Sequence, residues 1–168
     1  MASKILSCEK LFIIGCGTAY HAGLLGSYAM TRLAGIDARA VVASEFSEEV
    51  LDLVDEKTAV LAVSQSGETM DTLNALRDAK AKGASVLSII NVMGSTMMRL
   101  SDVYIGQSCG PEIGVAATKS FTSQVAVLLR LAATVGRKTG KVPVRNIQEV
   151  EDALHRTPGI IQELLNTK

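Results

Sequence analysis

The fold is decided by residues 58–69, which read TAVLAVSQSGET. The first half is an almost unbroken apolar run, and a strand without polar alternation must be covered on both faces. Such a strand belongs in a parallel sheet between two layers of helices. The second half is polar, contains one glycine, and leads into a helical pattern that Gly83 ends. This stretch therefore predicts strand, loop and helix of an α/β domain.

The same alternation extends along most of the chain. Strands are predicted at residues 10–14, 38–43, 58–63, 85–90 and 103–105, and helices at residues 19–33, 69–82, 95–100 and 118–135. We therefore expect a doubly wound α/β fold with a mainly five-stranded, flavodoxin-like parallel sheet and helices on both faces. Right-handed crossovers gather the strand-to-helix loops at the carboxyl edge of the sheet, where ligands bind in such folds.

The length of 168 residues fits one domain. We expect a core over about residues 8–138 and a helical tail or linker over residues 139–168. In that tail a weaker helical segment precedes a second one, which starts at Thr157-Pro158 and runs to Lys168. Residues 1–168 are thus predicted to form a single domain.

Composition excludes several classes of partner. Seventeen basic residues balance seventeen acidic ones, so no overall field favours nucleic acid or an anionic membrane. No apolar run approaches the roughly 18 residues that span a bilayer. The three cysteines lack metal-ligand or CxxC spacing, which predicts free thiols and a cytoplasmic protein. We expect neither a metal nor a cofactor.

The loop of residues 64–69 (SQSGET) is the best candidate for an anion site. Hydroxyls of Ser64, Ser66 and Thr69, close approach at Gly67, and first-turn amides of the next helix suit a phosphate. Gln65 adds an amide for a sugar hydroxyl. The alternative is a helix cap with Ser66 as the N-cap, but a cap needs only one such residue. The nucleotide pattern GxxxxGK[ST] is missing.

The first loop, residues 15–18 (GCGT), also joins a strand to a helix. Its glycines and Thr18 suit either an anion site or a tight turn with Thr18 as cap. It copies part of a dinucleotide fingerprint, but Tyr20 stands where the third glycine belongs.

The third loop, residues 108–118, contains glycines, one proline and Glu112, and it ends in Thr118 as a predicted N-cap. A loop of this length could fold over a ligand. Lys119 at the helix start is interpreted as a solvated side chain.

Four motifs together resemble the glucosamine-6-phosphate synthase family, also called glutamine–fructose-6-phosphate aminotransferase. They are CGTAYHAG (16–23), ASEF (43–46), SQSGETMDTL (64–73) and GPEIGVAATK (110–119). The resemblance covers roughly residues 10–137, in family order and spacing. It implies a sugar isomerase (SIS) domain, the first of two such subdomains that follow a glutaminase domain.

The resemblance also implies a ligand, fructose 6-phosphate or glucosamine 6-phosphate. By resemblance the contacts come from Thr18, Ala19, Ser64, Gln65, Ser66, Thr69, Val115 and Ala117, with Ser64, Ser66 and Thr69 holding the phosphate. Ala19 and Ala117 stand where other members carry serine, so those two contacts would use backbone atoms.

The family's catalytic lysine, glutamate and histidine lie in the second subdomain or its tail and have no counterpart here. We therefore predict no catalytic residue in this chain. It would bind the sugar phosphate without converting it. We expect it to be a fragment of an aminotransferase that also carries the second subdomain and the glutaminase domain. Isomerisation needs a base placed at the substrate carbon.

Two alternatives stay open. The chain could be a standalone SIS-domain isomerase or sugar-phosphate sensor, with Glu45, Glu112, His21 and Lys119 as the available acid–base groups, or a nucleotide-binding module. Exposed apolar surface on the helix of residues 118–135 predicts a homodimer.

Overall fold

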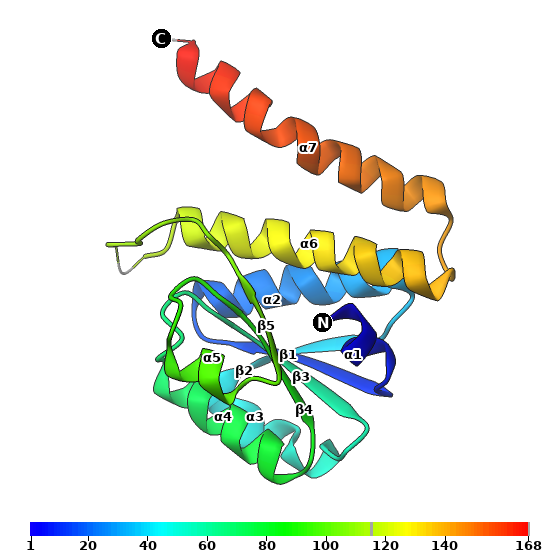
Figure 1. Cartoon of the computed structure of the whole chain (residues 1–168), viewed down its shortest axis with the longest axis vertical. Coiled ribbons are helices and arrows are strands. Elements are labelled where there is room, and N and C mark those ends of the chain that lie inside the picture. The colour runs from blue at the N-terminus through cyan, green and yellow to red at the C-terminus, as the bar shows by residue number, and fades with distance from the viewer. Residues whose placement is uncertain (115, 168) are drawn as a thin grey trace.

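The protein is represented by a computed structural model that describes residues 1–114 and 116–167. Its centre is a sheet of five parallel strands in the order β2-β1-β3-β4-β5 (Figure 1). The strands are β1 (Lys10–Gly15), β2 (Ala38–Val42), β3 (Thr58–Ser64), β4 (Ser85–Ile90) and β5 (Val103–Gly106). The predicted doubly wound, five-stranded α/β fold is therefore confirmed, including the flavodoxin-like strand order.

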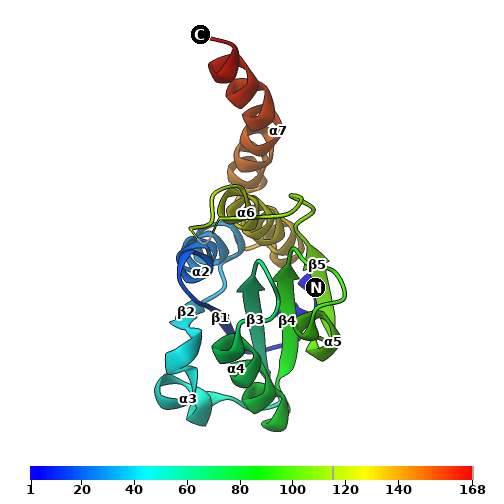
Figure 2. The same ribbon diagram turned by 90° about the vertical axis from the view of Figure 1, so that its left-hand side faces the viewer.

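Helices cover both faces of this sheet. The α-helices are α1 (Ala2–Leu6), α2 (Thr18–Ala29), α3 (Phe46–Glu49), α4 (Met70–Ala81), α5 (Thr96–Leu100), α6 (Lys119–Thr139) and α7 (Val144–Asn166). The shorter elements are a π turn that continues α2, η1 (Met30–Ala34), and two 3₁₀ turns, η2 (Ala43–Glu45) and η3 (Leu51–Leu53). Figures 1 and 2 show α2 and α6 on one face, and α3, α4 and α5 on the other.

Alternate side chains of the strands supply the two cores. Ile13 and Leu61 pack in the core that includes Leu128 of α6. Val60 and the other inward side chains of the opposite face pack with Leu76 of α4. All seven residues of β3 are buried, as expected for a central parallel strand. Full burial of one such aliphatic side chain contributes about 1.5–3 kcal/mol, so both helix layers are held firmly on the sheet.

The pairing of α2 with α6 depends on a small residue. A Cβ atom added at Gly26 of α2 would lie 2.9 Å from the Leu128 side chain of α6. A larger residue would have to displace Leu128, so Gly26 allows α2 and α6 to pack closely.

Two features at the ends of the chain differ from the sequence prediction. Residues 2–6 form the short helix α1, whose Ile5 is buried in the core with α6, although no helix was predicted there. The predicted break at Thr157-Pro158 is wrong, because α7 continues through Pro158 as one helix. A proline removes one helical hydrogen bond, and on an exposed helix this loss need not end the helix.

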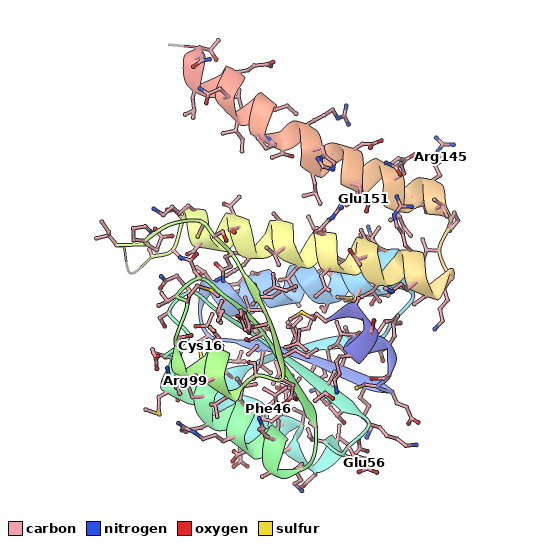
Figure 3. The ribbon with its side chains drawn as sticks, in the orientation of Figure 1. Cys16, Phe46, Glu56, Arg99, Arg145 and Glu151 are labelled. Atoms are coloured by element: carbon pink, nitrogen blue, oxygen red, sulfur yellow. The ribbon has the colours of Figure 1, made fainter. Side chains whose placement is uncertain are left out.

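Only the first half of α7 is anchored to the rest of the chain. Ile147 is fully buried, and the Glu151 carboxylate accepts hydrogen bonds from Arg130 and Arg137 of α6 (Figure 3). These bonds lower the pKa of Glu151, with the Arg137 hydrogen bond as the main cause. Residues 155–167 are exposed throughout.

Among the helices that the structure describes, none combines the length and hydropathy needed to cross a membrane.

Candidate functional site

The three loops singled out in the sequence meet at the carboxyl edge of the sheet. They enclose a cavity of about 180 Å³. The lining residues are Cys16, Thr18, Ala19, Val63, Ser64, Gln65, Ser66, Thr69, Glu112, Gly114, Ala117 and Gln124. Its walls are therefore built from the end of β3 and from the approaches to α2, α4 and α6.

The loop of residues 64–69 is fixed by bonds within itself. The Gly67 amide donates to Ser64 Oγ at 3.0 Å, and the Glu68 amide donates to Ser66 Oγ at 3.1 Å. Gly67 has φ +68°, and an added Cβ would lie 2.3 Å from Ser95 Oγ. Both the backbone conformation and the available space therefore require glycine here.

This loop leaves the N-terminus of α4 open. The alternative with Ser66 as N-cap is wrong, because Thr69 occupies that position and its side chain makes no capping hydrogen bond. In the described part of the chain, the amides of residues 70–72 donate no hydrogen bond. Free first-turn amides and the helix dipole favour an anion at this point.

The start of α2 forms the neighbouring wall. Its N-cap is Gly17, with φ +56°, so the prediction of Thr18 as cap is wrong. Thr18 and Ala19 instead lie in the first turn and line the cavity. Cys16 Sγ lies 3.7 Å from Thr72 Oγ1, a hydrogen bond that ties this loop to α4. Figure 3 shows Cys16 at this end of the molecule.

The N-terminus of α6 is closed by a carboxylate of its own loop. Thr118 is the N-cap residue, as predicted, but the capping group is Glu112. Glu112 Oε2 accepts from the Ser120 amide at 3.0 Å, Ser120 Oγ at 2.9 Å and the Thr118 amide at 3.2 Å. The Ser120 amide bond is the main reason that the pKa of Glu112 is lowered. Glu112 therefore stays ionised at neutral pH.

The structure brings seven of the eight predicted ligand residues to one cavity. These are Thr18, Ala19, Ser64, Gln65, Ser66, Thr69 and Ala117. The eighth, Val115, lies outside the described residues. Of the four acid–base candidates, Glu112 lines the cavity, whereas Glu45, His21 and Lys119 are not among its lining residues.

One lining residue with a functional side chain, Gln124, was missed in the sequence. It lies on α6 one turn after Ser120 and one turn before Leu128, on the buried side of the helix. A glutamine on the apolar face of a helix is unusual, and this departure from the pattern was the available signal.

The fold and the cavity define a class of protein, a doubly wound α/β domain with a small polar pocket at the carboxyl edge of its sheet. The family model described as SIS domain matches residues 4–134. The chain belongs to the SIS domain family.

Sequence relatives specify the similarity further. The chain is 41% identical over 162 residues to "Glutamine--fructose-6-phosphate aminotransferase [isomerizing]" of Thermococcus kodakarensis, covering 96% of this chain and 27% of that protein. The protein of the same name from Symbiobacterium thermophilum is 43% identical over 157 residues, or 94% of this chain and 26% of the relative. The resemblance inferred from the four motifs is thereby confirmed. The chain spans about a quarter of the length of these curated relatives.

Solved structures agree with the similarity found in the sequences. The C-terminal domain of glucosamine-fructose-6-phosphate aminotransferase from Francisella tularensis superposes with a TM-score of 0.84 and 30% identity, over 92% of this chain and 44% of that one. A putative phosphosugar isomerase from Clostridium difficile gives a TM-score of 0.82 and 26% identity, over 95% of this chain and 47% of that one. In both cases the chain corresponds to just under half of the solved chain.

Proposed function

We propose that this chain is a sugar-phosphate-binding SIS domain that holds fructose 6-phosphate or glucosamine 6-phosphate. The observation that carries the proposal is the cavity beside the open N-terminus of α4, where Ser64, Ser66 and Thr69 line one wall. Hydroxyls and free amides converge there without a bulky side chain, as a phosphate group requires. Ala19 and Ala117 line the same cavity, where they could contribute backbone contacts.

We further propose that the chain works within a longer glutamine-dependent aminotransferase. The relatives named above support this, since they extend well beyond the matched region. A second SIS subdomain would supply the catalytic lysine, glutamate and histidine, and a glutaminase domain would supply ammonia. On this proposal residues 1–168 form one domain with a helical tail, and the chain alone binds the sugar phosphate without converting it.

The alternatives fit the cavity less well. Glu112 is the single acid–base candidate in its lining, and that carboxylate is engaged at the start of α6. A standalone isomerase would need a further base at the substrate carbon. A volume of about 180 Å³ is below the roughly 300–1,000 Å³ of pockets for drug-sized ligands, which disfavours a dinucleotide.

The predicted homodimer is also part of the proposal. Most of the apolar face of α6 packs within the chain, whereas four large apolar residues are exposed on the second half of α7. These are Ile160, Ile161, Leu164 and Leu165. Apolar surface of this kind supports association with another protein surface, either a second copy or a neighbouring subdomain.

Cys8, Cys16 and Cys109 are free thiols. The cytoplasmic location that they suggest stays a prediction.

The proposal is tested by ligand-dependent thermal stability. A ligand that binds the folded state raises Tm by mass action, so fructose 6-phosphate and glucosamine 6-phosphate should both raise it at millimolar concentration, and glucose should not. Ser66→Ala should lower sugar-phosphate affinity about tenfold or more, because a hydrogen bond to a charged group is lost. Ser47→Ala is the matched control, since Ser47 is exposed and bonds to Asp78 away from the cavity.

The decisive comparison is between these two variants. Wild-type affinity in Ser47→Ala, with reduced affinity in Ser66→Ala, supports the phosphate site. If neither sugar phosphate stabilises the unaltered chain, the proposed function is wrong for this chain.

A further inference from the structure

Gln124 is a wall residue of the cavity whose side chain has an unsatisfied polar atom. Its side chain is buried, with 1% of the residue exposed, and the residue lines the cavity. In the part of the chain that the structure describes, its Oε1 atom has no hydrogen-bond partner. Because buried side-chain oxygens are nearly always hydrogen-bonded, this acceptor calls for a donor that a ligand or water supplies.

Among the described residues, the neighbours of Gln124 on the buried side of α6 do not supply that donor. One turn before Gln124, Ser120 Oγ donates its hydrogen to Glu112 at 2.9 Å. One turn after it, Leu128 is fully buried in the apolar core. Gln124 is thus the point at which the buried side of α6 changes from apolar core to cavity wall.

The cavity has two chemically different sides. On the α4 side stand hydroxyls and the open helix N-terminus, all suited to an anion. On the α6 side stand the Glu112 carboxylate, an acceptor, and the Gln124 amide, whose Oε1 is the atom without a partner. These helices cover opposite faces of the sheet (Figures 1 and 2), so the two sides face each other across its edge.

The difference between the α4 side and the α6 side of the cavity fixes the orientation of a bound sugar phosphate. A phosphate dianion carries only acceptor oxygens, so it cannot satisfy Gln124 Oε1 and is repelled by the Glu112 carboxylate. Hydroxyl and ammonium groups are donors and can bond to Oε1. The phosphate therefore belongs on the α4 side and the sugar carbons on the α6 side.

We propose that Gln124 is a specificity-determining residue whose Oε1 accepts a hydrogen bond from a hydroxyl or ammonium group on the sugar. The proposal rests on the proposed function, since it presumes a phosphate at α4. Gln124 then distinguishes a sugar phosphate from phosphate alone. In this it differs from Ser66, which serves both ligands.

The test is calorimetric titration of fructose 6-phosphate and of inorganic phosphate at pH 8, where phosphate is a dianion. Gln124→Met keeps the side-chain length and removes the acceptor. It should weaken fructose 6-phosphate binding about tenfold, the equivalent of about 1.4 kcal/mol, and leave inorganic phosphate binding unchanged. Gln124→Asn, which withdraws the amide by one carbon, should give a loss of the same kind and serves if the methionine variant is unstable.

The outcomes separate the two proposals. If Gln124→Met and Gln124→Asn bind fructose 6-phosphate as the unaltered chain does while Ser66→Ala does not, the role of Gln124 is refuted and the proposed function stands. An equal loss for both ligands also refutes it, because the amide would then face the phosphate. If the unaltered chain binds no fructose 6-phosphate, both proposals fail.

Discussion

The N-termini of α4 and α6 lie at the same edge of the sheet, but they differ in whether the chain itself supplies an acceptor to their amides. At α6 the Glu112 carboxylate accepts from two backbone amides and two hydroxyls, so an acceptor of the chain itself occupies the helix start. At α4 the N-cap Thr69 makes no side-chain capping bond, and the first-turn amides donate to nothing in the described residues. The first-turn amides of a helix thus contribute to stability at α6, where Glu112 accepts from them, and are available to a ligand at α4.

The comparison teaches how such a site can be recognised. A capped helix start contains an acidic or hydroxyl group whose bonds are local. An open helix start next to a cavity instead has hydroxyls in excess of those that the cap uses, as in residues 64–69. The absence of a local acceptor is therefore more informative than the presence of serine or threonine alone.

The largest expected effect comes from distorting the loop of residues 64–69 that precedes the open helix start. Gly67→Ala forces alanine into φ +68° and places its Cβ 2.3 Å from Ser95 Oγ. We expect a loss of more than about 2 kcal/mol in unfolding free energy, from the left-handed conformation and the overlap together, and loss of fructose 6-phosphate binding. Chemical denaturation and calorimetry would measure the two effects.

Gly94→Ala is the matched control for strain without overlap. Gly94 has φ +78°, but nothing lies within 4 Å of its added Cβ. Its cost should be about 1–2 kcal/mol, with fructose 6-phosphate binding retained. Equal stability losses in Gly67→Ala and Gly94→Ala would show that the contact with Ser95 is not what constrains the loop.

An intermediate effect is expected from opening the closed helix start. Glu112→Gln removes the charged acceptor of α6, so Tm at pH 7 should fall by less than in Gly67→Ala. The pKa of Glu112 is lowered on folding, mainly by the Ser120 amide, so its stabilisation is fully present above the unfolded value of about 4.3. The Tm difference from the unaltered chain should therefore shrink as the pH falls below that value.

Scanning calorimetry between pH 3 and pH 8 would follow this Tm difference. A second measurement, the affinity of Glu112→Gln for inorganic phosphate at pH 8, tests whether the start of α6 takes part in the phosphate site proposed at α4. A phosphate affinity that falls in Glu112→Gln as far as in Ser66→Ala would break the distinction between the two helix starts.

The smallest effect is expected at Glu68, which lies inside the α4 loop but serves α5. Glu68 Oε1 accepts from the Thr96 amide at 2.7 Å, and this bond is the main reason that the pKa of Glu68 is lowered. Glu68→Gln should lower Tm slightly at pH 7, in the same pH direction as Glu112→Gln, because α5 has only five residues. Thermal melts at pH 7 and pH 3 would detect it, and a greater fall than in Glu112→Gln would contradict this ranking.

Much of the fold could be predicted because each strand and helix has a local pattern. The run at residues 60–63 predicted a central buried strand, and β3 is buried along its whole length. The continuous α7 could not be predicted, since Pro158 normally signals a boundary and nothing local shows that the helix tolerates it. Helix α1 was missed because five residues are too few for a periodic pattern.

The candidate site was predicted loop by loop, with Ser64, Ser66 and Thr69 placed by their position after a strand. The roles of Glu112 and Gln124 were not. Glu112 bonds to Ser120, eight residues away, and Gln124 lines a cavity whose opposite wall comes from residues more than fifty positions earlier. No local pattern reports such distant relations.

The sequence by itself determined the α/β alternation, the strand-to-helix loops and the family, because apolar runs, glycines and hydroxyls act over a few neighbouring residues. Only the tertiary structure decided which helix start stays open and which side of the cavity donates or accepts hydrogen bonds. The physical reason is that hydrogen-bond satisfaction depends on which groups the packed helices and sheet bring within about 3 Å, and that is a property of the whole fold.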